Sequence, residues 1–416
     1  MDLDPLASRP ISRRRLLQGT ALAGFGAFLA ACTGSSPTPS PTATPAAPTA
    51  SASAGPTPTP EITPTPAITG PLMWANWPAY IDLVGAAANA GAYSPGSSPT
   101  IEAFKKQYKV DVKYVEDIQA NEDFFKQKLE TQFVAGKPTG WDLIVMTDWM
   151  AGKLIAKSWI QKIDQSAVPN CVQNLRDPLK NQTWDPGNDY HYPWQSGMTG
   201  VGYDSTALTK ANIPAPTKIA DLWNIDPKKV TFLTEKRDTF GLGLLKLGKD
   251  PTQATADDLQ AVHDDMKPLA DKGLRFTGND YLQDFASRKT WAAMVWSGDL
   301  ANSGAADQKF VFPEEGTMIW TDNMMIPKGA TNVYTAELMM NWVYDPKIAA
   351  QIADYVKYVS PVKGADTEIE KIDKGASSNP LMFPTQDIIA KQKSFQYLTQ
   401  DLEDTLNSLY SDLAGA

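Results

Sequence analysis

Short apolar runs alternate with helical patterns from Pro71 onward, and this alternation limits the possible folds more than any other feature. Residues 72–74 open an apolar strand, Asp142 to Met146 form another strand, and Val112 and Tyr114 alternate with charged residues as in a half-buried strand. Apolar side chains at helical spacing occupy 101–108 and 125–133, with Asn121 expected as the N-cap of the second helix. This order predicts an α/β fold.

A second block of the same kind lies beyond Gly200. It predicts strands at 230–233 and 292–296, a helix beginning near Glu235, and a helix capped by Thr255 and stopped by Gly273. Two blocks, each near the size of a small domain, indicate two lobes, each with its own mixed sheet flanked by helices, rather than one sheet. We place the first lobe at 71–196 plus 323–365 and the second at 197–322 plus 366–416.

The stretch Met318–Met324, MIWTDNM, has an acid inside an apolar strand. Trp320 and Asp322 are two residues apart, so their side chains point to the same face. Ligands of open α/β sheets bind at the carboxyl ends of strands. Nearly every predicted strand end carries a tryptophan, an acid or both, at Asn76-Trp77, Thr147-Asp148-Trp149, Leu233-Thr234-Glu235, Trp296-Ser297-Gly298 and Trp320-Thr321-Asp322. These side chains predict one shared cleft.

Residues 1–31 have the organisation of a bacterial export signal. Arginines at 13–15 precede an apolar run from Leu22 to Ala31 that is too short to span a bilayer permanently. Adjacent arginines are typical of twin-arginine signals. Leu29-Ala30-Ala31-Cys32 resembles the lipobox of bacterial lipoproteins, in which the cysteine receives a diacylglyceryl group. We therefore expect an exported protein, anchored through Cys32 at the outer face of the cytoplasmic membrane or in the periplasm.

The segment after Cys32 has the composition of a tether. Thr33 to Gly70 contains ten prolines, many Ser, Thr and Ala residues, and one charged residue, Glu61. Such a segment buries too little apolar surface to fold, and its prolines favour an extended chain of roughly 3 Å per residue. Residues 32–70 are therefore expected to be a disordered tether between the anchor and the folded body.

Charge and residue counts exclude several functions. The chain has 38 basic and 47 acidic residues, and removal of residues 1–31, with four arginines and two aspartates, leaves 34 and 45, a net charge of −11. This balance disfavours nucleic acid and anionic membrane surfaces as partners. Cys171 has no second cysteine to pair with once Cys32 is lipidated, and His191 and His263 are too few for a two-histidine zinc site of the usual kind or a typical triad. We expect no metal site and no cofactor.

Seven motifs occur in an order and spacing that resemble the spermidine/putrescine-binding proteins of bacterial ABC importers. They are NWPAY, DLIVMTDW, DPGNDYHYPWQSGMTGVGYD, EKRDTFGLGLLKLG, MVWSGD, MIWTDNMMIPKGA and SFQYL, within about residues 72–410. The resemblance implies a type II periplasmic-binding-protein fold with a ligand cleft between two lobes that close by a hinge. It also implies a monomeric receptor that delivers a small cationic amine to a membrane permease served by an ATPase, and no enzymatic activity.

In that family the polyamine lies between aromatic rings, and carboxylates bind its ammonium groups. Matched by position, the ligand-binding residues are Trp77, Tyr80, Thr147, Trp149, Glu235, Asp238, Trp296, Trp320, Asp322, Tyr358 and Gln396. Thr147 and Trp149 depart from the Ser and Tyr common in the family. Ala79 replaces a frequent acid, which leaves open whether the ligand is spermidine or putrescine.

Several of these residues also have plain structural explanations. Glu235 and Asp238 suit a helix N-terminus, and Arg237 between them is expected to form a salt bridge with one of the two. Asp299 is expected at the surface, and His191 in a structural role.

Two other functions remain open at this stage. The same fold can bind another small organic cation, such as an opine-like amine, a cationic amino-acid derivative or thiamine. A surface enzyme is the weakest hypothesis, because the sequence shows neither a nucleophile–base pair nor a metal cluster.

Overall fold

The computed structural model describes residues 66–83, 98–278, 280–303, 305–395 and 397–415. Within this part, the chain from Ile68 onward forms one compact unit. The predicted signal peptide, Cys32, nearly all of the tether, most of the loop at 85–99 and Gln396 lie outside the described residues. Among the described residues, no helix combines the length and apolar character needed to cross a bilayer.

Ten strands pair into one mixed sheet. The strands are β1 (Leu72–Ala75), β2 (Val112–Val115), β3 (Leu143–Thr147), β4 (Tyr192–Asp204), β5 (Val230–Leu233), β6 (Arg275–Thr277), β7 (Ala292–Trp296), β8 (Gln308–Val311), β9 (Thr317–Met325) and β10 (Gln392–Lys393). Their order is β2-β1-β3-β9-β4-β7-β5-β6, with β10 beside β9 and β8 beside β4. β1, β2 and β3 are parallel, as are β5, β6 and β7, whereas β4 and β9 run antiparallel to their main neighbours.

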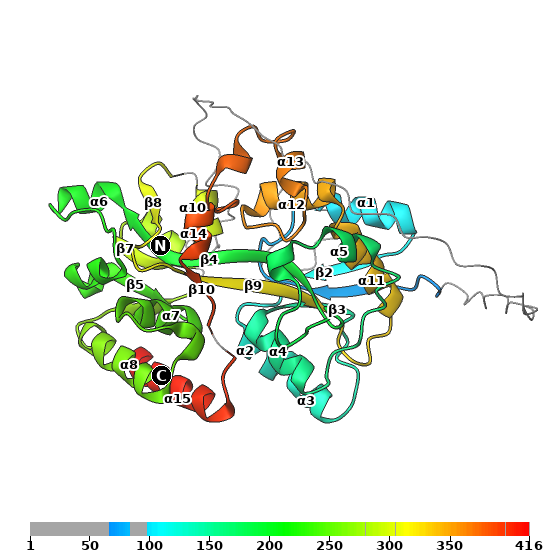
Figure 1. Ribbon diagram of the computed structural model, residues 1–416, viewed down its shortest axis with the longest axis horizontal. Helices are drawn as coiled ribbons and strands as arrows, with labels where there is room; N and C mark the ends of the chain where they lie inside the picture. Colours follow the sequence, from blue (N-terminus) through cyan, green and yellow to red (C-terminus); the bar gives the residue numbers. More distant parts are fainter. Residues whose placement is uncertain (1–65, 84–97, 279, 304, 396, 416) are drawn as a thin grey trace, which may run out of the picture. The chain divides into compact units, whose positions relative to one another are not determined.

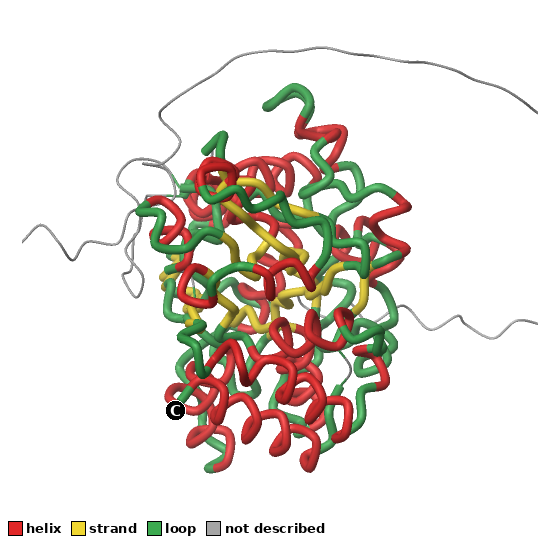
Figure 2. Tube along the Cα trace, turned by 90° about the vertical axis from the view of Figure 1, so that its left-hand side faces the viewer, coloured by secondary structure: helices red, strands yellow, loops and turns green. Residues whose placement is uncertain are grey.

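Helices lie on both faces of this sheet (Figures 1 and 2). They are α1 (Pro99–Tyr108), α2 (Asn121–Phe124), α3 (Glu130–Val134), α4 (Asp148–Ala156), α5 (Pro169–Asn174), α6 (Ser205–Lys210), α7 (Lys236–Lys246), α8 (Ala256–Ala270), α9 (Tyr281–Ala286), α10 (Ser297–Ser303), α11 (Val333–Val343), α12 (Pro346–Val356), α13 (Ala365–Ile369), α14 (Gln386–Ala390) and α15 (Gln400–Ala414). A π-helical segment, Phe125–Leu129, joins α2 to α3. The α/β fold class is confirmed.

The two halves of the molecule have separate apolar cores. Two clusters, built around residues such as Trp74, Phe104 and Met150, surround β1, β2 and β3, and we call this part the first half. A third cluster, with Phe232, Phe240 and others, surrounds β5, β6 and β7 and defines the second half. Ile369, Ala376 and Met382 pack in the first half, beyond the predicted lobe boundary at 365. The predicted lobe bounds stay a prediction.

The expectation of two separate sheets is wrong, because β4 and β9 belong to both halves. β4 pairs with β9 through residues 192–199 and with β7 through residues 199–203. β9 pairs with β3 through residues 322–325 and with β10 at 317–318. Figure 1 shows these two strands running side by side through the middle of the sheet. Hydrogen-bonded strands therefore continue from one half to the other.

β4 is absent from the elements predicted from sequence, although at 13 residues it is the longest strand in the described part of the chain. Pro193, Gly197, Gly200 and Gly202 interrupt its apolar pattern, and such residues usually mark turns. At Gly197 a β-carbon would overlap the indole ring of Trp320 on β9, so the missing side chain makes room for that ring. The glycine here is needed for close packing within a strand rather than for a turn.

Short sequence patterns predicted other strands and helix ends correctly. β5 and β7 have the predicted bounds, and Thr255 and Asp258 form the expected capping box of α8. Asn121 was wrongly expected to cap a helix, since Ala120 takes that position and Asn121 is the first residue of α2. The Asn121 side chain instead donates to the Thr147 hydroxyl and accepts the Thr147 backbone N–H, because the end of β3 lies beside the start of α2.

Candidate functional site

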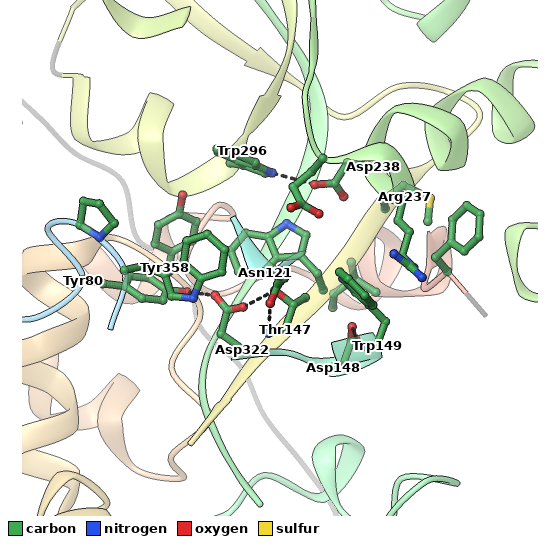
Figure 3. A pocket seen from close by; sticks show the side chains of 17 residues that line it. Tyr80, Asn121, Thr147, Asp148, Trp149, Arg237, Asp238, Trp296, Asp322 and Tyr358 are labelled. Carbon is green, nitrogen blue, oxygen red and sulfur yellow. Dashed lines mark hydrogen bonds between the residues drawn. The ribbon is translucent and has the colours of Figure 1, made fainter. Parts of the chain in front are cut away.

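One cavity lies where β3, β7 and α7 approach the middle of β9. Its empty volume is about 820 Å³ when the solvent at its mouth is included. The structure brings ten of the eleven predicted ligand-binding residues to its wall, and the eleventh, Gln396, lies outside the described residues. These ten are Trp77, Tyr80, Thr147, Trp149, Glu235, Asp238, Trp296, Trp320, Asp322 and Tyr358. Figure 3 shows the cavity with its lining side chains as sticks.

Asp322 lies at the centre of a buried hydrogen-bond chain. Tyr80 donates its hydroxyl to Oδ2 of Asp322 at 2.9 Å, and Thr147 donates to Oδ1 at 2.8 Å. The Thr147 hydroxyl in turn accepts from the side-chain amide of Asn121 at 2.8 Å. Asp322 pairs with Thr147 in the β3–β9 ladder, so both strands hold this geometry. Asp322 is therefore in the middle of β9, and the expectation that it ends its strand is wrong.

The Asp322 carboxyl group has hydrogen-bond donors but, within the described residues, no ion-pair partner. Burial raises the pKa of Asp322 to about 7, although the bonds from Thr147 and Tyr80 act in the opposite direction. Among the described residues, no basic side chain forms an ion pair with it. A cation placed beside Asp322 would favour the charged form of this carboxyl group.

Glu235 and Asp238 face the cavity from the start of α7. Asp238 accepts a hydrogen bond from the indole N–H of Trp296 at 2.8 Å, and burial raises its pKa to about 6. Burial raises the pKa of Glu235 to about 8, and the nearby Asp238 adds to the shift. Neither acid forms an ion pair within the described part of the chain.

Arg237 does not pair with either of its neighbours, contrary to expectation. Its Nη2 lies 2.5 Å from Oε2 of Glu403 on α15, and its guanidinium carbon lies 3.6 Å from the centre of the Trp149 ring. Arg237 is 7% exposed, and its Nε has no hydrogen-bond partner in the described part of the chain. The side chain thus joins α7 to α15 and α4 while lining the cavity.

Aromatic rings form another part of the cavity wall. The Tyr358 ring lies 5.5 Å from that of Tyr80 and 5.4 Å from that of Trp320, measured between ring centres. Trp320 donates its indole N–H to Thr199 on β4 at 3.2 Å. The Thr199 hydroxyl also hydrogen-bonds Asp238, so one β4 residue positions a ring and an acid. Thr199 is not among the predicted site residues, because β4 is not among the predicted strands.

Asp299 supports this wall from behind. It is fully buried, so the expectation of a surface position is wrong. Tyr281 and Tyr358 donate their hydroxyls to its two oxygens at 2.6 and 3.1 Å. The Tyr281 hydroxyl also accepts the backbone N–H of Trp296. Asp299 is therefore a positioning residue for Tyr358 and, through Tyr281, for the end of β7.

Other residues of interest lie away from the cavity. His191 is buried and bonds Asp185 at 2.7 Å, as expected for a structural histidine, and burial lowers its pKa. Cys171 is buried and free. Ala79, at the position where a family acid is common, donates its backbone N–H to Glu116 at 2.7 Å. Thus Glu116 places a carboxylate beside this loop from β2.

The fold and the cavity are those of a receptor for a small solute. The chain belongs to the bacterial extracellular solute-binding protein family, whose sequence profile matches residues 100–384. It is 29% identical over 264 residues to the spermidine/putrescine-binding periplasmic protein of Salmonella typhimurium, covering 63% of this chain and 73% of that protein. It is 28% identical over 311 residues to the putrescine-binding periplasmic protein PotF of Escherichia coli, covering 70% and 81%.

Solved structures show the same fold. A putative spermidine/putrescine ABC transporter protein from Listeria monocytogenes superposes with a TM-score of 0.69 at 24% identity. The match covers 82% of this chain and 98% of that one. Family members are solute-binding receptors, and the type II periplasmic-binding-protein fold is confirmed.

Proposed function

We propose that this protein is the substrate-binding receptor of an ABC importer and captures a polyamine, spermidine or putrescine. One observation carries the proposal: carboxylates and aromatic rings from both halves meet in a single cavity. Thr147 and Trp149 come from the first half, Glu235 and Asp238 from the second, and Asp322 from the strand common to both. The polyamine-binding relatives named above support it.

The chemistry of the cavity suits a flexible cation. A polyamine at neutral pH is an apolar chain with two or more positive charges, and an ammonium group buried without a partner is very costly. Carboxylates supply charge-assisted hydrogen bonds, and aromatic faces pack on methylene groups and attract cations by roughly 0.5–2 kcal/mol each. Asp322, Glu235 and Asp238 are proposed to bind the amines.

The rings are proposed to enclose the carbon chain. Trp77, Tyr80, Trp296, Trp320 and Tyr358 all line the cavity, and three of them have a second task. Trp77 donates to the Val145 carbonyl, Trp296 to Asp238 and Trp320 to Thr199, so the indole rings are held in place before a ligand arrives. Gln396 stays a predicted contact at one end of the ligand.

Export and anchoring are part of the proposal. Residues 1–31 would be the twin-arginine signal, Cys32 the lipidated N-terminus and 32–70 the tether, with a monomeric body that delivers its ligand to a permease and ATPase. We also propose that it performs no catalysis. Cys32→Ser is expected to release the protein from the membrane fraction, and Arg13→Lys with Arg14→Lys is expected to stall export. Membrane retention of the first variant would count against the lipid anchor.

A second candidate is a ligand that carries a carboxylate as well as amines, such as an opine-like compound or a cationic amino-acid derivative. Arg237 supports it, since its guanidinium group, paired with Glu403, is the one basic group among the described lining residues. The surplus of acids in the same cavity makes it the weaker candidate.

Isothermal titration calorimetry on the folded body tests the choice. Spermidine or putrescine is expected to bind with a dissociation constant in the micromolar range or below, which corresponds to about −8 kcal/mol or better. The melting temperature and the intrinsic tryptophan fluorescence are recorded with each amine. If neither quantity changed with spermidine or with putrescine, the polyamine assignment would be overturned. Tighter binding of lysine- or arginine-derived compounds would favour the second candidate.

A further inference from the structure

Four carboxylates, not three, line the cavity. The fourth is Asp148, which follows β3 directly and begins α4. The residue before it, Thr147, pairs with Asp322 across the β3–β9 ladder, so Asp148 comes beside the next residue of β9, Thr321. Figure 3 shows Asp148 next to Thr147 and Trp149 in the wall. Asp148 therefore stands at the start of α4, one residue beyond the Thr147–Asp322 pair of the ladder.

The hydrogen bonds of Asp148 leave its charge unbalanced. Its carboxyl group accepts the backbone N–H of Trp149 at 2.8 Å and the backbone N–H of Thr321. Both donors are neutral amides, and no ion pair with Asp148 exists within the described part of the chain. Burial raises the pKa of Asp148 to about 7, with Asp238 adding to the shift, whereas the two backbone hydrogen bonds and the charge of Arg237 oppose it. The negative charge of Asp148 also contributes to the raised pKa of Asp322.

The cavity therefore has more negative charge than a diamine can match. Asp148, Glu235, Asp238 and Asp322 carry up to four charges, and the one basic side chain among the described lining residues, Arg237, is paired with Glu403. Putrescine brings two positive charges, spermidine three and spermine four. Asp322 is buried and the other three acids are half-buried, so any carboxylate of this set that lacks a cation either stays protonated or bears a desolvation cost.

We propose that Asp148 is a specificity-determining residue that binds an additional amino group, so that the site prefers a polyamine with three or more amines over a diamine. This inference rests on the proposed polyamine-binding function.

A purely structural role for Asp148 makes a different prediction. An acid in the first turn of a helix stabilises the helix dipole, and such an effect would not depend on the ligand. Asn and Ser both accept hydrogen bonds at helix starts, so Asp148→Asn and Asp148→Ser remove the charge while keeping an acceptor. Asp123→Asn is the matched control, since Asp123 is exposed on α2 and lies outside the cavity.

The experiment is a calorimetric titration of each protein with putrescine, spermidine and spermine at pH 7.5, with melting temperatures recorded alongside. The native protein is expected to bind spermidine at least tenfold more tightly than putrescine. Asp148→Asn and Asp148→Ser are expected to weaken binding of spermidine and spermine at least tenfold and of putrescine less than threefold. Asp123→Asn is expected to change all three less than twofold.

The remaining outcomes separate a failure of this inference from a failure of the proposed function. Equal weakening for the three amines, no weakening for spermidine, or a native preference for putrescine would overturn the inference while leaving the polyamine function intact. Failure of the native protein to bind any of the three would overturn the proposed function, and the inference with it. Two charge-removing variants are used so that misfolding of one still leaves a decisive measurement.

Discussion

Lys236 on α7 lies with its Nζ 2.8 Å from Oε2 of Glu122 on α2, so a salt bridge joins the two halves beside the cavity. The next residue, Arg237, stacks on Trp149 of α4. Both contacts link the start of α7 to the first half. We expect both contacts to favour closure of the two halves over the cavity, and their loss to favour opening.

Removing the charge at Glu122 is expected to loosen this closure. Each side chain of the pair is 22% exposed, so Glu122→Gln should cost about 0.5–1 kcal/mol of ligand affinity, a few-fold rise in the dissociation constant. The dissociation rate of a bound polyamine, followed by tryptophan fluorescence in stopped flow, should rise by the same factor. Asp123→Asn on the same helix serves as the control. An unchanged dissociation rate would mean that the salt bridge does not contribute to closure.

Asp322→Asn should have the largest effect on binding. If this carboxylate pairs with a buried ammonium group, its loss should cost on the order of 2–5 kcal/mol of affinity, measured by calorimetry. The ligand-free variant should melt at the same or a higher temperature, because a buried carboxyl group without a cation does not stabilise the fold. Unchanged affinity would remove Asp322 from the binding residues.

Gly197→Ala tests the packing of Trp320. A methyl group here would overlap the indole ring, so the ring must move and its bond to Thr199 must lengthen. We expect at least a tenfold loss of affinity and a shifted tryptophan emission spectrum. Gly278→Ala is the control, since a β-carbon there meets its nearest neighbour at an ordinary 3.5 Å. Equal behaviour of the two variants would contradict the close packing of Gly197 on Trp320.

Affinity should fall as the pH is lowered from about 8 to 6. In the free protein the pKa values of Glu235, Asp148, Asp322 and Asp238 are raised to about 8, 7, 7 and 6. A bound ammonium group favours the charged carboxylate, so at a pH below the pKa of an acid, binding of the amine releases that acid's proton. For each proton released, the dissociation constant rises by up to tenfold for every unit by which the pH is lowered. Calorimetry in buffers of different ionisation enthalpy counts these protons. A dissociation constant independent of pH over this range would refute the expectation.

The stability of the free protein should change in the opposite direction. Carboxyl groups with raised pKa values bind more protons in the folded than in the unfolded state at pH 6.5–8.5, so unfolding free energy increases as the pH falls through this window. The window stops at 6.5 because His191, whose pKa is lowered by burial, opposes the trend below it. Urea unfolding at several pH values measures the slope, and Glu235→Gln should reduce it. A slope of the other sign would show that these acids are charged when free.

Patterns confined to a short segment predicted the fold well, and contacts between distant segments were harder to predict. β5, β7 and the capping box of α8 follow from alternation, composition and one helix-start signal. β4 was missed because its glycines serve contacts with Trp320 and other partners that are far away in the sequence. Sequence periodicity carries no information about such partners.

The candidate site shows the same division. Ten predicted residues line the cavity because strand ends and the family resemblance identify positions along the chain. The resemblance does not show which neighbours complete the site. From sequence alone, Asp148 is one more acid at a strand end, Asn121 is a helix cap and Asp299 is a surface residue. Each misplaced residue depends on a partner that only the fold brings near: Thr321 for Asp148, Thr147 for Asn121 and Tyr358 for Asp299.

The sharing of β4 and β9 between the halves has a mechanical consequence. Any rotation of one half against the other must bend or twist these two strands, and Trp320 and Asp322 lie on the stretch where β9 leaves one half and enters the other. A ligand held by these two residues acts at the hinge of the movement rather than at the outer edges of the two halves. Small changes in backbone curvature there translate into large displacements at the outer edges, where a transporter would sense whether the receptor is loaded.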